Sequence, residues 1–166
     1  RASKRGADLT QKLLTFSRKQ SLAPSVIELE LALGQVVEML RRTLGEAIEV
    51  DWGVEPDCPP CLADASQLDN AIVNLSLNAR DAMPAGGTLR IRARALLVTE
   101  AGDSDMELAP GRYVEISIID NGKGMEPEVL ARACEPFYTT KPSGKGSGLG
   151  LSMVYGFAKQ SGGSFA

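Results

Sequence analysis

The chain has 166 residues, of which 43% are hydrophobic, and its net charge is −3 at pH 7. This composition is ordinary for a soluble globular domain with its own core, and the charge gives no electrostatic reason to expect nucleic-acid binding. No apolar run approaches the roughly 20 residues that span a bilayer, and the opening "RASKRGADLT" lacks the apolar segment of a signal peptide, so no direct membrane contact is expected.

The first half of the chain mixes helical and strand patterns. Residues 1–20 predict a basic amphipathic helix, and residues 26–29 predict a short strand. Residues 31–44 have helical apolar spacing, whereas residues 47–55 alternate as a strand does until three prolines interrupt the pattern. A long helix is expected over about 65–83, and "PAGG" then indicates a turn.

The second half contains two strongly alternating segments. Residues 88–98 and 112–120 predict strands, separated by a loop over 101–111. A short helix is expected at 127–133, and a last helix ends near Gln160. Strands and helices that mix without strict βαβ alternation predict an α+β fold, a two-layer sandwich in which a mixed sheet packs against helices.

The three cysteines allow more than one interpretation. Cys58 and Cys61 have the C-x-x-C spacing of zinc and redox sites, and Cys134 is the remaining thiol. A zinc site would need two further ligands, and the chain contains no histidine. A redox motif should open a helix, whereas prolines and a short strand surround this one, so a structural role is favoured. Reduced thiols are typical of the cytosol, which predicts a cytoplasmic location and leaves open a membrane-anchored parent protein.

The predicted helix at 65–83 carries two different stripes. Apolar residues recur along one face at Leu68, Ile72, Leu75, Ala79 and Ala82. Asn74, Asn78 and Asp81 share a second face within "NLSLNARDAM". Asparagine is a poor helix former, so two on one stripe suggest a ligand that needs carboxamide oxygens. A solvated polar face is the alternative that the decamer alone would favour.

The stretch "IIDNGKGM" ends the strand at 112–120. Asp120 lies at the strand end, and Gly122 and Gly124 follow it in a loop. Glycines let the backbone approach a ligand closely, and a carboxylate at this place can accept a hydrogen bond from an exocyclic amine such as that of adenine. An ordinary strand-to-turn junction is the alternative.

Alternating glycines precede the last helix in "GKGSGLGLSMVYGFAKQ". A helix N-terminus offers free N–H groups and a positive dipole end, which favours phosphate, and Lys141 and Lys145 could add charge. The pattern matches neither the Walker nor the Rossmann glycine motif, and a flexible hinge is the alternative. The glycines are Gly144, Gly146, Gly148 and Gly150.

Together these stretches resemble the ATP-binding catalytic domain of sensor histidine kinases, in the wider group that includes gyrase, Hsp90 and MutL. "NLSLNARDAM" resembles the N box, "DNGKGM" the G1 box, "EPFYTTK" the F box and "GKGSGLGLS" the G2 box. The resemblance covers about residues 26–166, and "GADLTQKLLTFSRKQSLAP" resembles the end of the second dimerisation helix. It implies a Bergerat-type ATP-binding fold, with the dimerisation helix and linker at 1–22 and a catalytic domain at 23–166 whose last strands would lie beyond Ala166.

The resemblance implies a role for individual residues. Asn74 and Asn78 would hold Mg²⁺ and the phosphates, because amide oxygens suit this hard cation. Asp120 would accept from the adenine amine, and the glycines of the last stretch would close over the triphosphate. The implied ATP site comprises Asn74, Asn78, Asp81, Asp120, Gly122, Gly124, Phe137, Lys141, Gly144, Gly146, Gly148, Leu149 and Gly150.

Asp81 differs from the family pattern. Many members carry a lysine at this position that helps to bind phosphate, whereas an aspartate repels phosphate unless it works through the metal or a neighbouring lysine. Arg80 points off the polar face. Asp81 is therefore expected near the site, with its role open.

The resemblance implies a protein-histidine kinase that transfers the γ-phosphate of ATP to a histidine outside this chain, since the chain itself contains none. Gyrase, Hsp90 and MutL share a water-activating glutamate four residues before the metal asparagine, where this chain has Asn74. A gyrase- or Hsp90-like ATPase and a nucleotide-binding module without catalysis are the alternatives. The implied partners are ATP, the phospho-acceptor dimerisation helices and a response-regulator receiver domain.

Overall fold

The computed structural model describes residues 23–99, 108–142 and 146–166. The predicted helix at 1–20 lies outside these residues. The elements in chain order are β1 (Ser25–Ile27), α2 (Leu29–Leu44), β2 (Ile48–Val54), β3 (Cys61–Ala63), α3 (Ala65–Ala82), β4 (Gly87–Val98), β5 (Gly111–Asp120), α4 (Pro127–Leu130) and α5 (Gly150–Gln160). The strand predicted at 26–29 is shorter, because Leu29 already belongs to α2, and the helix predicted at 127–133 is regular only to Leu130.

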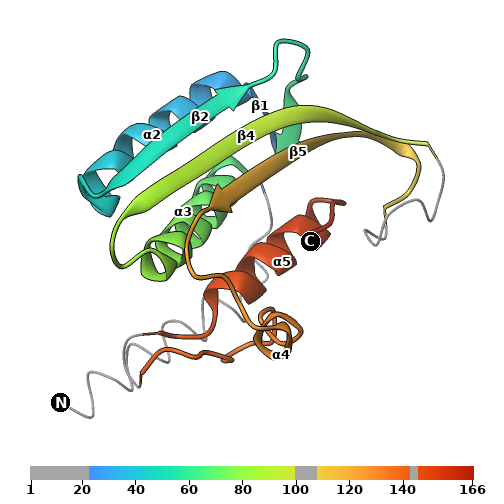
Figure 1. The fold of residues 1–166 in the computed structure, drawn as a ribbon. Helices are drawn as coiled ribbons and strands as arrows, with labels where there is room; N and C mark the ends of the chain where they lie inside the picture. Colours follow the sequence, from blue (N-terminus) through green and yellow to red (C-terminus); the bar gives the residue numbers. More distant parts are fainter. Residues whose placement is uncertain (1–22, 100–107, 143–145) are drawn as a thin grey trace.

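The three long strands form a mixed sheet in the order β2-β4-β5. The central strand β4 runs parallel to β2 and antiparallel to β5. The helices α2 and α3 pack on one face of this sheet, and α5 lies alongside α3 (Figure 1). The short strands β1 and β3 pair antiparallel as a separate small sheet. The predicted α+β fold, a mixed sheet layered on helices, is confirmed.

Alternation along β4 separates the core from the outer face of the sheet. Leu89, Ile91 and Ala93 are fully buried against the helices. The residues that alternate with these three face the other side of the sheet, as the period of a strand requires. There they form ion pairs with neighbouring strands: Arg90 and Arg92 with Asp51, and Arg94 with Glu115.

The apolar stripe predicted for α3 largely coincides with its buried face. Leu68, Ile72 and Ala79 are buried, whereas Leu75 and Ala82 are only half-buried. Because an α-helix turns 100° per residue, Leu75 and Ala82 lie on the edge of the stripe nearest the polar residues. They are therefore less buried than the rest of the stripe. Because the opposite edge is in the core, the polar stripe of α3 is held at one defined orientation.

Asp64 caps α3 and also fastens the start of the described chain. Its Oδ1 accepts a hydrogen bond from the Gln67 backbone N–H at 3.0 Å, and its Oδ2 accepts one from the Ala23 N–H at 3.0 Å. These two N–H donors lower the pKa of the Asp64 carboxyl, the bond from Ala23 most. The ionised carboxylate therefore satisfies a helix N–H and ties β1 to the start of α3.

We expect Asp64→Ala to lower the melting temperature at pH 7. A carboxyl with a lowered pKa in the folded state contributes stability above its unfolded pKa and loses it as the pH falls through the folded pKa. The difference in melting temperature should therefore disappear well below pH 3.8, the ordinary value. Thermal melting from pH 7 to pH 2.5 checks this, with Asp57→Ala in an exposed turn as the control. A difference that persists unchanged at pH 2.5 would contradict the assigned role of the charge.

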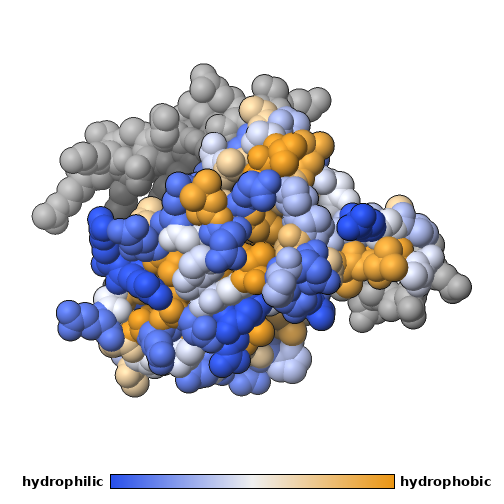
Figure 2. Space-filling model, turned by 90° about the horizontal axis from the view of Figure 1, so that it is seen from above, coloured by the Kyte–Doolittle hydropathy of each residue, from blue (hydrophilic) through white to orange (hydrophobic). Residues whose placement is uncertain are grey.

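The surface seen from above carries apolar residues in separate groups among hydrophilic ones (Figure 2). The most exposed large apolar side chains in the described residues include Val26, Leu31 and Leu62. No helix in the described part of the chain is both long and apolar enough to cross a membrane.

Candidate functional site

The polar stripe of α3 faces the first turn of α5. A Cβ atom built on Gly150 would lie 3.7 Å from Asn78 Nδ2 and 3.8 Å from Asn74 Oδ1. The stripe and the helix start are therefore in close approach, although they are more than 70 residues apart in sequence. A helix start has unsatisfied N–H groups and a partial positive charge. Amide side chains of α3 and the backbone donors of the α5 start thus meet on one side of α3.

The loop after β5 is pressed against the end of α3. The Gly122 N–H donates to Asp120 Oδ1 at 2.8 Å, and the Lys123 N–H donates to the Ala82 carbonyl at 3.1 Å. A Cβ atom on Gly122 would lie 2.7 Å from the Ala82 carbonyl oxygen, so only glycine allows this approach. Asp120 is exposed at the strand end beside this contact. Its Oδ2 has no partner among the described residues and is available to a ligand.

Asn121 also holds this loop, and it was not among the predicted site residues. Its Oδ1 accepts a hydrogen bond from the Thr88 N–H at 2.9 Å. The same oxygen contacts the position where a side chain at Gly87 would lie. The signal that could have identified it is its place directly between the strand-end aspartate and the first loop glycine.

The described parts of the connection between α4 and α5, residues 131–142 and 146–149, bring the F-box stretch and the described end of the G2-box stretch together. The Phe137 N–H donates to the Gly148 carbonyl at 2.8 Å. A Cβ atom on Gly148 would overlap the Phe137 backbone, and Gly148 itself has a φ of 65°. Phe137 has a φ of 69° and is the non-glycine residue with a positive φ in the described chain. This strained position is held by the contact with Gly148.

The remaining predicted site residues are buried, half-buried, exposed or outside the described residues. Leu149 is buried and precedes α5 directly. Gly146 is half-buried, and a Cβ atom there would lie 2.8 Å from Thr139 Oγ1. Gly124, in the loop after β5, has a φ of 68° and open space around it. Gly144 lies outside the described residues.

Lys141 reaches from the α4–α5 connection to the polar stripe of α3. Its Nζ donates to Asn78 Oδ1 at 3.2 Å and to Asp81 Oδ2 at 2.5 Å. Arg80 pairs with the other carboxylate oxygen of Asp81 at 3.2 Å. Partial burial raises the pKa of Asp81, but the hydrogen bonds from Lys141 and Arg80 outweigh it and leave that pKa below its ordinary value. Asp81 is therefore an ionised partner of a lysine on another element.

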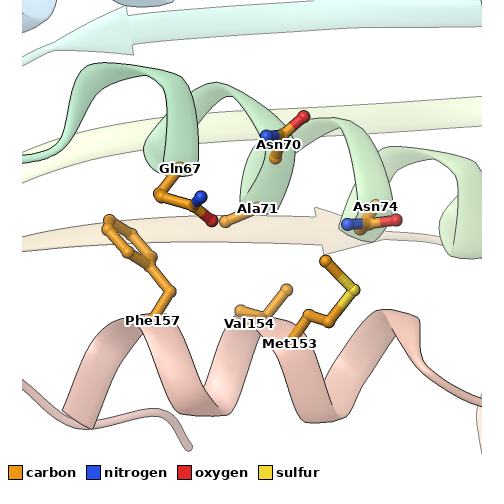
Figure 3. A pocket seen from close by; sticks show the side chains of 7 residues that line it. All are labelled: Gln67, Asn70, Ala71, Asn74, Met153, Val154 and Phe157. Atoms are coloured by element: carbon orange, nitrogen blue, oxygen red, sulfur yellow. The ribbon is translucent and has the colours of Figure 1, made fainter. Parts of the chain in front are cut away.

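A small hollow between α3 and α5 extends the polar stripe toward the start of α3 (Figure 3). Amide side chains come from α3 and apolar ones from α5, and Asn74 belongs to both the hollow and the predicted site. Asn70 lies one turn before Asn74 and was missing from the prediction, although the four-residue spacing that links Asn74 with Asn78 also leads back to it. The lining residues are Gln67, Asn70, Ala71, Asn74, Met153, Val154 and Phe157.

The three cysteines lie in the described part of the chain, and none of them belongs to a metal-ligand cluster there. No group of three or more His, Cys, Asp or Glu residues that could hold a metal ion occurs among residues 23–99, 108–142 and 146–166. Burial raises the thiol pKa of Cys58, Cys61 and Cys134. Redox-active and metal-binding cysteines have lowered pKa values, so these thiols stay protonated at neutral pH.

Known proteins are similar to this chain in sequence and in architecture. Residues 63–166 match the family described as histidine kinase-, DNA gyrase B- and HSP90-like ATPases. The chain is 43% identical to the sensor kinase CckA of Brucella abortus over 96% of its own length, which is 17% of that relative. Full-length ShkA, solved in complex with AMPPNP, is 29% identical with a TM-score of 0.62, covering 83% of this chain and 26% of ShkA. The histidine kinase ThkA, solved in complex with the response regulator TrrA, shares the fold at 18% identity with a TM-score of 0.69, covering 98% of this chain and 42% of ThkA.

Proposed function

Because the chain belongs to the family of histidine kinase-, DNA gyrase B- and HSP90-like ATPases, as an ATP-binding catalytic domain of the sensor histidine kinase type, we propose that it transfers the γ-phosphate of ATP to a histidine outside these 166 residues. The chain spans about one sixth of the length of CckA. The observation that carries the proposal is the approach of the α3 amides to the glycine-rich start of α5.

The nucleotide lies along the polar side of α3 in this proposal. Its adenine binds at the end of α3, where Asp120 Oδ2 accepts from the exocyclic amine and Gly122 and Gly124 shape the loop. Its phosphates bind near the start of α5, close to Asn74 and Asn78. The solution of ShkA in complex with AMPPNP supports the proposal that a domain of this fold binds an adenine nucleotide.

Mg²⁺ fits the donors at the phosphate end of the site. Asn74 and Asn78 supply amide oxygens, which this hard cation accepts together with phosphate and water oxygens. The contact of the Lys141 ammonium with Asn78 Oδ1 supports the proposal, because a cationic group already binds this oxygen. Asn74 and Asn78 would hold Mg²⁺, which would neutralise charge on the phosphate oxygens.

The α4–α5 connection would close over the phosphates. Gly144, Gly146, Gly148 and Gly150 have no side chains that would keep phosphate from the backbone N–H groups. Leu149 anchors the end of the connection in the core, because it is buried where α5 begins. Phe137 is half exposed and would belong to the part that moves when nucleotide or the dimerisation helices bind.

Phosphate transfer to a partner is favoured over hydrolysis by the side chain at position 74. A gyrase- or Hsp90-like ATPase uses a carboxylate there to take a proton from water, and the Asn74 amide is not a base. An acceptor imidazole is itself a nucleophile and needs no such base on this domain. If the domain formed neither a phosphorylated acceptor nor free inorganic phosphate, it would be a nucleotide-binding module without catalysis.

The domain organisation and partners follow from the same proposal. Residues 1–22 would be the end of the second dimerisation helix with its linker, and residues 23–166 the catalytic domain. The partners would be the phospho-acceptor helices and, downstream, a receiver domain, as ThkA binds the response regulator TrrA. In this proposal the domain acts in the cytoplasm.

Transfer in trans tests the proposal. The chain is incubated with Mg²⁺ and γ-labelled ATP, with and without the histidine-bearing dimerisation helices of its parent kinase. We expect label on the added helices, labile to acid and stable to base, and none on the chain, which has no histidine. Release of labelled inorganic phosphate by the chain alone would favour the ATPase, and nucleotide binding without either product would favour the non-catalytic module.

A further inference from the structure

Lys141 contacts two residues of α3, Asp81 and Asn78, which lie 60 and 63 residues before it in the sequence. The ammonium lies between the amide oxygen of Asn78 and the carboxylate of Asp81, and two thirds of the Lys141 side chain is shielded from solvent. A lysine has three donors and no acceptor, so this arrangement satisfies two of them with oxygens of one helix. This contact is a side-chain link between the α4–α5 connection and the polar stripe of α3.

The oxygen that Lys141 contacts is the one that the proposed function assigns to the metal. A lysine ammonium and Mg²⁺ repel each other strongly at the short separation that a shared oxygen imposes. Lys141 and the cation of a Mg²⁺–nucleotide complex therefore cannot both bind Asn78 Oδ1 closely. Without nucleotide, the lysine supplies the positive charge at this place.

Asp81 determines where the ammonium lies. Its Oδ2 makes the shorter of the two contacts with Lys141, and its ionised state is stabilised by this lysine and by Arg80. The flexible lysine stem would otherwise let the ammonium remain in solvent. An aspartate beside a phosphate site is unfavourable on its own, but here it is neutralised by a cation that the α4–α5 connection carries.

On the premise of the proposed function, we infer that Asp81 is a positioning residue that holds Lys141 on Asn78 and so fastens the α4–α5 connection to α3 until Mg²⁺–nucleotide displaces the lysine from Asn78. The device makes release of Lys141 from Asn78 and loading of the metal one event. It also gives Asp81 a role that needs no direct contact with phosphate.

Hydrogen exchange of the nucleotide-free chain tests the fastening. Exchange is measured by mass spectrometry on peptides from residues 131–142 in the wild type, Asp81→Asn, Lys141→Met and the double variant. Each single variant should speed exchange roughly 2- to 5-fold, as expected for a partly exposed ion pair, and the double variant should add nothing further. Arg42→Met, which breaks the exposed pair with Glu38 on α2, is the matched control. Unchanged exchange in the single variants, or additive effects in the double, would overturn the inference.

Nucleotide titration tests the displacement. The affinity for AMPPNP is measured with and without Mg²⁺. The affinity with Mg²⁺ is divided by the affinity without it, and this ratio is compared between the wild type and Lys141→Met. The ratio should rise in Lys141→Met for two reasons. Mg²⁺ no longer competes with the lysine for Asn78, and nucleotide without Mg²⁺ loses the positive charge of the lysine. A ratio that stays equal or falls would overturn the displacement. If wild-type chain binds no AMPPNP, the proposed function fails, while the exchange measurement still decides whether the fastening exists.

Discussion

Asn78→Ala is expected to weaken Mg²⁺-dependent binding of an ATP analogue about 10- to 100-fold, the cost of one oxygen ligand to a charged group. The expectation follows from the position of Asn78 on the stripe of α3 that faces Gly150 and contacts Lys141. Affinity measured without Mg²⁺ should change much less. Calorimetric titration with AMPPNP in both conditions gives the two values.

Asn70→Ala is the matched control for this prediction. Asn70 is an exposed amide on the same helix, two turns before Asn78, and it lines the hollow toward α5. Removal of the Asn70 amide should leave the gain in AMPPNP affinity on addition of Mg²⁺ unchanged. If Asn78→Ala and Asn70→Ala had the same Mg²⁺ dependence as the wild type, Asn78 would not be a metal ligand.

Asp120→Asn is expected to reduce the preference of the site for adenine over guanine. The amide oxygen of the asparagine can keep the hydrogen bond from the Gly122 N–H, so the loop should stay in place. The second carboxylate oxygen becomes an NH₂ group, which cannot accept from the adenine amine but can donate to the carbonyl oxygen of guanine. Affinity for the ATP analogue should fall about 10- to 100-fold, with no matching loss for the GTP analogue.

Competition titrations with both analogues check this prediction, and thermal melting confirms that the variant is folded. Asp57→Asn, in the turn after β2, serves as the control for a surface charge removed elsewhere. An equal loss of affinity for the ATP and GTP analogues would show that Asp120 supports the loop and does not read the base.

The sequence was sufficient for those parts of the fold that local periodicity determines. The buried stripe of α3, beginning at Leu68, and the alternation of β4 around Ile91 follow from the helical and strand periods alone. The meeting of the α3 amides with the start of α5 also agrees with the resemblance of Asn74, Asn78 and Gly150 to known boxes. The buried stripe and the alternation depend on which residue types recur at a fixed interval, whereas the α3–α5 contact was expected only from the resemblance.

Contacts between distant segments could not be predicted in the same way. The pairing of Lys141 with Asp81 depends on how the α4–α5 connection lies over α3, and no periodicity encodes that. The hydrogen bond from Thr88 to Asn121 likewise joins a strand to a loop 33 residues away. Side chains in irregular segments take their partners from the tertiary structure, which is why the role of Asp81 stayed open at the level of sequence.

Titration of the chain with AMPPNP, with and without Mg²⁺, tests the central claim most directly. The account predicts saturable binding of one nucleotide per chain, with a clear gain in affinity when Mg²⁺ is present. A chain that melts cooperatively, and so is folded, but gives no binding heat in either condition would contradict the assignment of the α3–α5 side as a nucleotide site.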